Sequence, residues 1–136
     1  MAENIRLEVV TPEKEVVNDM AQIVLAPGSL GEFGVLSGHT QFMTSLKTGA
    51  IHYRDESGKD QYVFVSGGFA EALPDKVTVL AESAEKMEDI DPERAKTALE
   101  RAEKRLAEDR AKEKVNIARA KAALERAMVR IKIAGL

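Results

Sequence analysis

The hydrophobic pattern of the chain changes once, near residue 86, and this change limits the fold more than any other feature. Before it, apolar residues such as Ile5, Leu7 and Val9 alternate with polar ones, which is the period of two of a half-buried strand. After Glu93 they recur with a period near 3.6, as on one face of an amphipathic helix. The sequence therefore predicts two domains, residues 1–86 built from strands and residues 87–136 built from helices.

Composition changes at the same place. The first 85 residues carry six basic and 13 acidic side chains, whereas the remainder carries 14 basic and 10 acidic ones. All six aromatic residues and eight of the nine glycines lie at or before Phe69. A length of 136 residues suits one small domain with an appendage. The second part of the chain, which would be the appendage, carries the net positive charge.

The first part is predicted to contain about eight short antiparallel strands. Residues 55–60 separate two strand-like runs and form the turn of one hairpin, and Pro74-Asp75-Lys76 forms the turn of another. Such spacing of turns is typical of a flattened β-sandwich or barrel. Two glycine-rich segments are expected to be irregular: residues 31–39 form a loop, and Ser66-Gly67-Gly68 forms a tight turn or bulge.

The second part begins with a clear helix signal. Asp91 can accept hydrogen bonds from the free amides at a helix start, and Pro92 suits the first helical position. No Gly or Pro interrupts the polar stretch 108–114, so the sequence permits either a helical hairpin or one long helix. The two apolar stripes, which favour the hairpin, are Ala95, Ala98, Leu99, Ala102 and Leu106, followed by Ile117, Ala120, Leu124, Ala127, Met128 and Ile131. A buried methyl contributes only about 1 kcal/mol, so an alanine-rich hairpin is expected to be held loosely.

Several function classes have no support in the sequence. The chain has no Cys and only two His, so it offers no disulfide framework, no thiol catalysis and no cluster of transition-metal ligands. We find no catalytic triad pattern and no phosphate-binding loop of the GxxxxGK[ST] type, and we expect no catalysis of its own. The basic part lacks aromatic residues, so nucleic-acid binding by stacking is not expected. We also expect no membrane span and no secretion signal.

The arginines of the second part are the strongest candidates for a binding site. Arg94 and Arg101 are seven residues apart, and Arg126 and Arg130 are four apart, so each pair lies on one helix face. In a closed hairpin these guanidinium groups could meet a polyphosphate, with Asp91 near the helix start. The alternative is that they are ordinary solvated arginines, paired with Glu93, Glu100, Glu103 and Glu125.

The chain resembles the epsilon subunit of the F-type ATP synthase in its bacterial or chloroplast form, almost from end to end. One departure is Ser37, where that family commonly has Pro before a Gly-His pair. The matching segments are Val10-Thr11-Pro12, Gly31-Glu32-Phe33-Gly34-Val35-Leu36-Ser37-Gly38-His39-Thr40, Val65-Ser66-Gly67-Gly68-Phe69, Pro74-Asp75-Lys76-Val77-Thr78-Val79-Leu80-Ala81 and Glu125-Arg126-Ala127-Met128-Val129-Arg130.

The resemblance implies a ten-stranded flattened sandwich followed by a two-helix hairpin, and a place in the central stalk. The sandwich would bind the gamma subunit and sit on the ring of c subunits, at the cytoplasmic face of the bacterial inner membrane, without crossing it. The family's ring contact corresponds to Glu32 and its gamma contact to His39. In this role the subunit couples proton flow to ATP synthesis and needs no cofactor.

The resemblance also implies regulation by the helices. In the family they fold back as a hairpin or extend into the catalytic head and inhibit ATP hydrolysis. Some members bind ATP in the folded form through a motif Ile/Leu-Asp-x-x-Arg-Ala, which here is Ile90 to Ala95, so ATP is a regulatory ligand to test. The accompanying positions match Glu85, Arg101, Arg126 and Arg130. The extended form would meet the acidic loops of the catalytic beta subunits with its basic surface, which comprises Lys114, Arg119, Lys121, Arg126, Arg130 and Lys132.

Two other classes remain open from the residues alone. One is a sandwich that binds a small ligand or sugar and dimerises through a coiled coil of its helices. The other, a small-barrel metalloenzyme, has less support because it would need clustered histidines.

Overall fold

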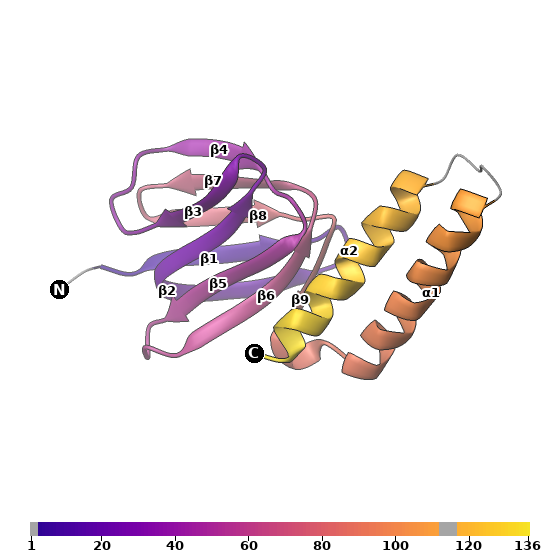
Figure 1. Cartoon of the computed structure of the whole chain (residues 1–136). Helices are drawn as coiled ribbons and strands as arrows, with labels where there is room; N and C mark the ends of the chain where they lie inside the picture. Colours follow the sequence, from indigo (N-terminus) through magenta and orange to yellow (C-terminus); the bar gives the residue numbers. More distant parts are fainter. Residues whose placement is uncertain (1–2, 112–116) are drawn as a thin grey trace. The chain divides into compact units, whose positions relative to one another are not determined.

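The computed structural model of the chain describes residues 3–111 and 117–136 (Figure 1), with no account of the side chains of 109–111. The chain divides into two compact units, Met1–Met87 and Glu88–Leu136. The predicted boundary at residue 86 lies one residue before this division.

The first unit is a β-sandwich with nine strands in the described residues. About eight were expected from the pattern and ten from the resemblance. The strands are β1 (Ile5–Val10), β2 (Glu15–Gly28), β3 (Gly31–Val35), β4 (Phe42–Ser45), β5 (Gly49–Asp55), β6 (Asp60–Ser66), β7 (Phe69–Leu73), β8 (Lys76–Leu80) and β9 (Ser83–Lys86). A short 3-10 helix, η1 (Met87–Asp89), begins where this unit ends.

The strands join in the order β4-β7-β8-β1-β2-β5-β6-β9, with β3 also paired to β2. Both predicted hairpins are confirmed, since β5 pairs antiparallel with β6 and β7 with β8. One pair departs from the antiparallel prediction, because β1 and β8 run parallel. The long strand β2 pairs with β1 along its first half and with β3 and β5 along its second half, so it belongs to both parts of the folded sheet (Figure 1).

The expectation of a wholly irregular loop at residues 31–39 is wrong for its first half, which forms β3. The glycines of this segment not only allow turns but also allow neighbouring strands to approach closely. Gly34 lies opposite Leu25, and a Cβ at Gly34 would come within 2.9 Å of Leu25 Cδ2. Residues 36–41 do form a connection, in which Gly38 has a φ of 81°.

The core lies inside the sandwich and is built from alternate residues of its strands. Ile5, Leu7 and Val9 of β1 are fully buried, and Val77 and Val79 of the parallel neighbour β8 are buried beside them. Burial of each large apolar side chain contributes about 1.5 to 3 kcal/mol. This inward alternation leaves the intervening residues of the same strands for contacts outside the core.

The predicted turn at Ser66-Gly67-Gly68 is confirmed. Gly67 and Gly68 have φ values of 70° and 102°, a region that favours glycine. A Cβ at Gly68 would overlap the carbonyl oxygen of Leu80, so no other residue fits without a shift of the backbone. The chain turns here directly into β7 rather than into a helix, which excludes a phosphate loop at this position.

The second unit holds two helices, α1 (Pro92–Ala111) and α2 (Ile117–Ala134), which pack side by side and antiparallel (Figure 1). The hairpin alternative is therefore confirmed over the single long helix. The predicted stripes are buried at Ala95, Ala102, Ala120 and Ala127. They are wrong at Ala98, which is exposed, and at Met128, whose side chain is 55% exposed, while the buried Ile133 was not predicted. In the described residues no helix is both long enough and apolar enough to cross a membrane.

Candidate functional site

The start of α1 is capped by Asp91. Its Oδ1 accepts hydrogen bonds from the backbone amides of Glu93 at 3.0 Å and Arg94 at 3.2 Å, and its carbonyl oxygen accepts the amide of Ala95 at 3.0 Å. These bonds satisfy amides that the first turn of a helix leaves free. The helix starts at Pro92 as the sequence predicts, and the carboxylate of Asp91 is engaged by that helix.

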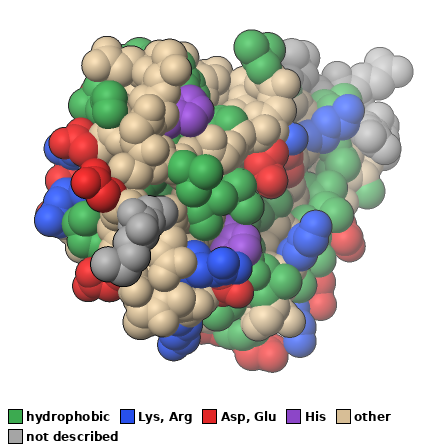
Figure 2. Space-filling model, turned by 90° about the vertical axis from the view of Figure 1, so that its left-hand side faces the viewer, with side chains coloured by type: hydrophobic (Ala, Val, Ile, Leu, Met, Phe, Trp, Pro, Cys, Tyr) green, Lys and Arg blue, Asp and Glu red, His purple; other side chains and the backbone are tan. Residues whose placement is uncertain are grey.

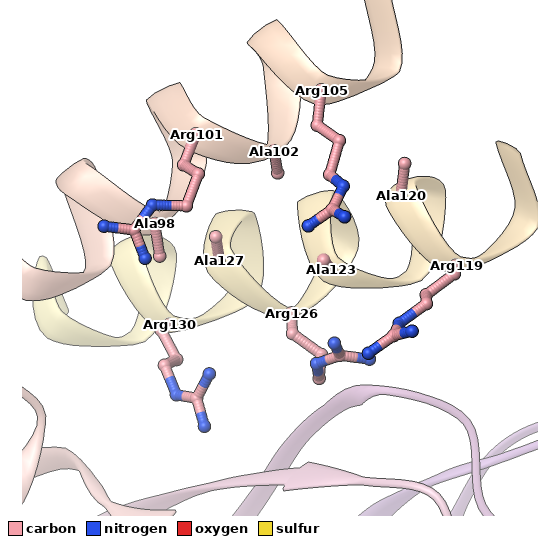
Figure 3. A pocket seen from close by; sticks show the side chains of 10 residues that line it. All are labelled: Ala98, Arg101, Ala102, Arg105, Arg119, Ala120, Ala123, Arg126, Ala127 and Arg130. Atoms are coloured by element: carbon pink, nitrogen blue, oxygen red, sulfur yellow. The ribbon is translucent and has the colours of Figure 1, made fainter. Parts of the chain in front are cut away.

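A groove of about 320 Å³ lies between α1 and α2 (Figure 3). The described residues that line it are all Ala or Arg. The alanines keep it open because their side chains are short, and the arginines stand around it. The lining residues are Ala98, Arg101, Ala102, Arg105, Arg119, Ala120, Ala123, Arg126, Ala127 and Arg130.

Three of the four predicted arginines, Arg101, Arg126 and Arg130, line this groove, and Arg94 does not. Figure 3 shows Arg101 and Arg105 reaching from α1, and Arg119, Arg126 and Arg130 extending from α2. Sequence reasoning missed Arg105 as a site residue and counted Arg119 only toward a basic surface. Their spacing was a usable signal, because Arg105 is four residues from Arg101 and Arg119 is seven from Arg126.

Four of these arginines have no carboxylate partner among the side chains that the structure describes. No Asp or Glu oxygen there lies within 4.0 Å of the guanidinium nitrogens of Arg101, Arg105, Arg119 or Arg126. Glu93 contacts Lys96 instead, at 3.7 Å. Arg94 and Arg101 are exposed, as the alternative of solvated arginines expects, but among the described side chains neither they nor Arg126 form the ion pairs with neighbouring glutamates that it also expects.

The groove has the chemistry of an anion site. Guanidinium groups donate hydrogen bonds and accept none, and their planar fork matches phosphate and carboxylate oxygens. Among the described residues that line it, none offers a nucleophile, a general base or a metal-ligating side chain. No group of three or more His, Cys, Asp or Glu that could hold a metal ion exists in the described part of the chain. The described lining therefore has the charge that suits a polyanion and includes no group for catalysis.

Glu85, the remaining predicted ATP residue, lies in β9 of the first unit, opposite Phe64 of β6. Lys114, which was counted toward the basic surface, lies outside the described residues. The predicted subunit contacts lie in the first unit. Glu32 is exposed on β3, directly after the hairpin turn that carries Leu30, whose side chain is fully exposed. His39 is half-buried, its Nδ1 lies 2.6 Å from the carbonyl oxygen of Thr40, and its ring packs edge-on against Phe42.

A row of outward-facing residues crosses four strands of the sandwich, and sequence reasoning missed it. Strand register places Ser45 of β4 opposite Phe69 of β7, Phe69 opposite Leu80 of β8, and Leu80 opposite Val10 of β1. Phe69 and Leu80 are 56% and 57% exposed. We call the apolar members of this face, Val10, Phe69 and Leu80 with the exposed Met43 on β4, the outer apolar row. Exposed hydrophobic side chains also reach the surface beside histidine on the face in Figure 2.

Both units match known family models. Residues 4–87 match the β-sandwich domain of the ATP synthase delta/epsilon chain, and residues 88–135 match its long α-helix domain. The chain is 53% identical over 135 residues to the ATP synthase epsilon chain of Nitratidesulfovibrio vulgaris, covering 99% of this chain and 98% of that one. It is 69% identical over 106 residues to the epsilon chain of Desulfosudis oleivorans, covering 78% and 80%.

Solved structures agree with this match. A chain in the Euglena gracilis mitochondrial ATP synthase, in a structure of OSCP, F1 and the c-ring, superposes with a TM-score of 0.77 at 26% identity, covering 94% of this chain and 79% of that one. A chain of the Tetrahymena thermophila mitochondrial ATP synthase central stalk and c-ring shares the fold, with a TM-score of 0.52 at 13% identity over 65% and 71% of the two chains.

The family matches cover both units, so neither a sugar-binding sandwich nor a metalloenzyme describes this chain. An epsilon chain is a non-catalytic subunit of an enzyme of ATP synthesis and proton transport. The chain belongs to the epsilon-chain family of the F-type ATP synthase, in its bacterial form, and is a central-stalk subunit.

Proposed function

We propose that the α1–α2 pair is an ATP-responsive brake on ATP hydrolysis by the synthase. The observation that carries this proposal is the groove with arginines from both helices and no carboxylate partner for Arg101, Arg105, Arg119 and Arg126 among the described side chains. Phosphates of ATP would occupy it and contact several guanidinium groups together.

Binding in this groove favours the packed pair of helices. Arg101 belongs to α1 and Arg126 and Arg130 to α2, so they share one ligand only while the helices lie side by side. A ligand shifts a conformational equilibrium by its difference in affinity for the two states. ATP therefore stabilises the closed pair, and its loss favours opening.

In the open state the same cations serve a different partner. Arg119, Lys121 and Lys132 are exposed on α2, and freed from a phosphate ligand the arginines of the groove add to that positive surface. Acidic loops of the catalytic beta subunits provide the complementary charge. Contact of this kind between rotor and head would oppose rotation in the hydrolysis direction.

The sandwich supplies the attachment. The outer apolar row presents Phe69 and Leu80 to solvent, and exposed apolar groups of this kind suit a protein interface, here with gamma. The turn with Leu30 and Glu32 projects a fully exposed apolar side chain beside a charge, and we assign it to the c-ring. The subunit would then be peripheral at the cytoplasmic face of the bacterial membrane.

Titration of the full-length chain with ATP by calorimetry tests the brake's ligand. Arg126→Gln removes one charge-assisted contact and should weaken binding about ten-fold. Lys132→Gln, on the same helix but outside the groove, removes the same charge and should leave the affinity within about two-fold. Absence of binding at millimolar ATP, or equal weakening by both substitutions, contradicts the proposal.

A further inference from the structure

A second pocket, of about 590 Å³, lies beside the outer apolar row within the sandwich unit. Three members of the row, Val10, Phe69 and Leu80, line it. The other lining residues come from the segments that follow β1, β4, β6 and β8, and they are Thr11, Pro12, Ser45, Leu46, Gly68, Ala81 and Glu82. Among the described residues that line this pocket, Glu82 is the one that carries a charge.

Glu82 brings to the pocket a carboxylate with no cation beside it. In the described part of the chain no Lys, Arg or His nitrogen lies within 4.0 Å of its oxygens. The two hydroxyl groups of the lining are already engaged locally. Thr11 Oγ1 donates a hydrogen bond to the carbonyl oxygen of Lys14 at 3.2 Å, and Ser45 Oγ donates one to Ser29 Oγ at 2.7 Å. The polar group that the pocket offers to a partner is therefore the carboxylate.

The turn before β7 determines where this carboxylate lies. A Cβ at Gly67 would come within 2.8 Å of Glu82 Oε2 and within 2.9 Å of Glu82 Cδ. The glycine therefore leaves the space that the carboxylate occupies against the backbone of the turn. The φ of 70° at Gly67 favours glycine for a second, independent reason. The carboxylate lies beside Gly68, which lines the pocket.

A protein that covers the pocket must also cover the exposed carboxylate of Glu82. Removal of a carboxylate from water is unfavourable unless a cation pairs with it. Lys and Arg side chains have an apolar stem, which suits Phe69 and Leu80, and a charged head, which suits the carboxylate. The strand part of the chain also attracts cations, because its first 85 residues carry 13 acidic and six basic side chains.

We propose that the pocket binds a lysine or arginine side chain of gamma, whose stem packs on Phe69 and Leu80 and whose cation pairs with Glu82. An apolar side chain in its place would leave the carboxylate unpaired, so Glu82 selects against such a partner. This inference rests on the proposed function, because it takes gamma as the partner of the outer apolar row. It goes further in naming a recognition residue outside the row and the type of side chain that it accepts.

The first test is the affinity of the full-length chain for purified gamma. Glu82→Gln should weaken binding about ten-fold, and Glu82→Asp, which keeps the charge on a shorter side chain, should lose less. Glu56→Gln is the matched control. It removes the same charge from an exposed position in the turn between β5 and β6, outside the pocket, and should change the affinity less than about two-fold.

Circular dichroism spectra must match the wild type for every variant compared. Unchanged affinity of Glu82→Gln, or equal weakening by Glu56→Gln, overturns the inference.

The dependence of affinity on salt separates an ion pair from a packing role of Glu82. Between about 0.05 and 0.5 M salt, the affinity of the wild type for gamma should fall more steeply than that of Glu82→Gln, because salt screens the ion pair that the variant lacks. Glu56→Gln should follow the wild type. Parallel salt dependence of the wild type and Glu82→Gln contradicts an ion pair at this position.

Double-mutant cycles identify the partner side chain. Each exposed Lys and Arg of gamma is replaced by Gln, and its binding is measured with the wild type and with Glu82→Gln. One replacement should weaken binding to the wild type about ten-fold and have little further effect with Glu82→Gln, because the pair is then already lost. If no basic residue of gamma behaves in this way, the inference is rejected.

These measurements distinguish this inference from the proposed function. Weaker binding of gamma by Phe69→Glu but not by Glu82→Gln would keep gamma on the outer apolar row and reject the role of Glu82. Unchanged binding by both would reject gamma as the partner of this face altogether. Self-association of the chain without gamma, abolished by Glu82→Gln, would assign the pocket to a second copy and also reject the inference.

Discussion

Asp91 holds the backbone amide of Arg94 at 3.2 Å from its Oδ1 and so fixes the first turn of α1. Both residues belong to the segment that resembles an ATP-binding motif, yet the structure uses the carboxylate as a helix cap. Neither residue lines the groove between the helices. The carboxylate of Asp91 therefore caps the helix, and if it also contacts a nucleotide it must do so while accepting these amide hydrogen bonds.

Capping predicts a specific pattern of substitution. Asp91→Ala should lower the free energy of unfolding by about 1 kcal/mol, whereas Asp91→Asn, which also accepts the amide hydrogens, should change it by only a few tenths. Thermal unfolding followed at the helix band in circular dichroism measures both. If Asn destabilises as much as Ala, the negative charge rather than the cap geometry is what α1 requires.

The outer apolar row predicts where gamma binds. Phe69→Glu places a charge in the centre of the row, next to Leu80, and should weaken association with gamma ten-fold or more, as loss of a central apolar contact does at about 1.4 kcal/mol or above. The sandwich should remain folded because Phe69 is 56% exposed. A binding assay with purified gamma measures the affinity.

Lys59→Gln is the matched control for this prediction. It also makes the net charge more negative by one, and Lys59 lies exposed in the turn between β5 and β6, outside the row. We expect its affinity for gamma to equal that of the wild type. Unchanged binding by Phe69→Glu, or equal weakening by the control, removes the row from the interface.

The same turn predicts a dependence of stability on acid. Asp55 accepts hydrogen bonds from Ser57 Oγ at 2.6 Å and Gln61 Nε2 at 3.0 Å and from backbone amides, and these bonds lower its pKa from 3.8 to about 2. A depressed pKa means that the ionised group stabilises the fold above pH 3.8 and that this contribution is lost as the pH falls toward 2.

Urea unfolding of the wild type and Asp55→Asn at pH 5 and pH 2 measures this contribution. The wild type should be the more stable at pH 5, and the difference between the two proteins should shrink at pH 2, because the carboxyl of Asp55 is then about half protonated in the folded protein and almost fully protonated in the unfolded one. A difference that stays constant between the two values contradicts the role assigned to the carboxylate.

The sequence predicted elements wherever the local pattern decides the structure. Alternation at Ile5, Leu7 and Val9 gave a core strand, and the Asp91-Pro92 signal gave the start of α1. It failed at β3, where glycines that usually indicate a loop are required by the close approach of Gly34 to Leu25. The parallel pairing of β1 with β8 could not be predicted either. The two strands are far apart in the sequence, so their pairing depends on the arrangement of the whole sheet rather than on a local pattern.

The candidate site shows the same division. The spacing of Arg126 and Arg130 predicted that they lie on one face of a helix. Which arginines share a groove, however, depends on which faces of α1 and α2 pack against each other. In the packed pair, Arg105 and Arg119 line the groove although they were not predicted as site residues, whereas Arg94 does not line it. The outer apolar row could have been suspected from Phe69 and Leu80, each next to a buried residue of its strand, but only the register places them side by side.

The most direct test of the account compares ATP hydrolysis by the assembled synthase containing the full-length chain with hydrolysis by one whose chain ends at Met87, the last residue of the first unit. Both forms of the chain must associate with gamma equally, so that any difference in the rate of ATP hydrolysis is due to the presence or absence of the helices. The account predicts faster hydrolysis without α1 and α2, with the largest difference at low ATP, where the groove is unoccupied and the helices open. Equal hydrolysis rates by the two enzymes at every ATP concentration would contradict it.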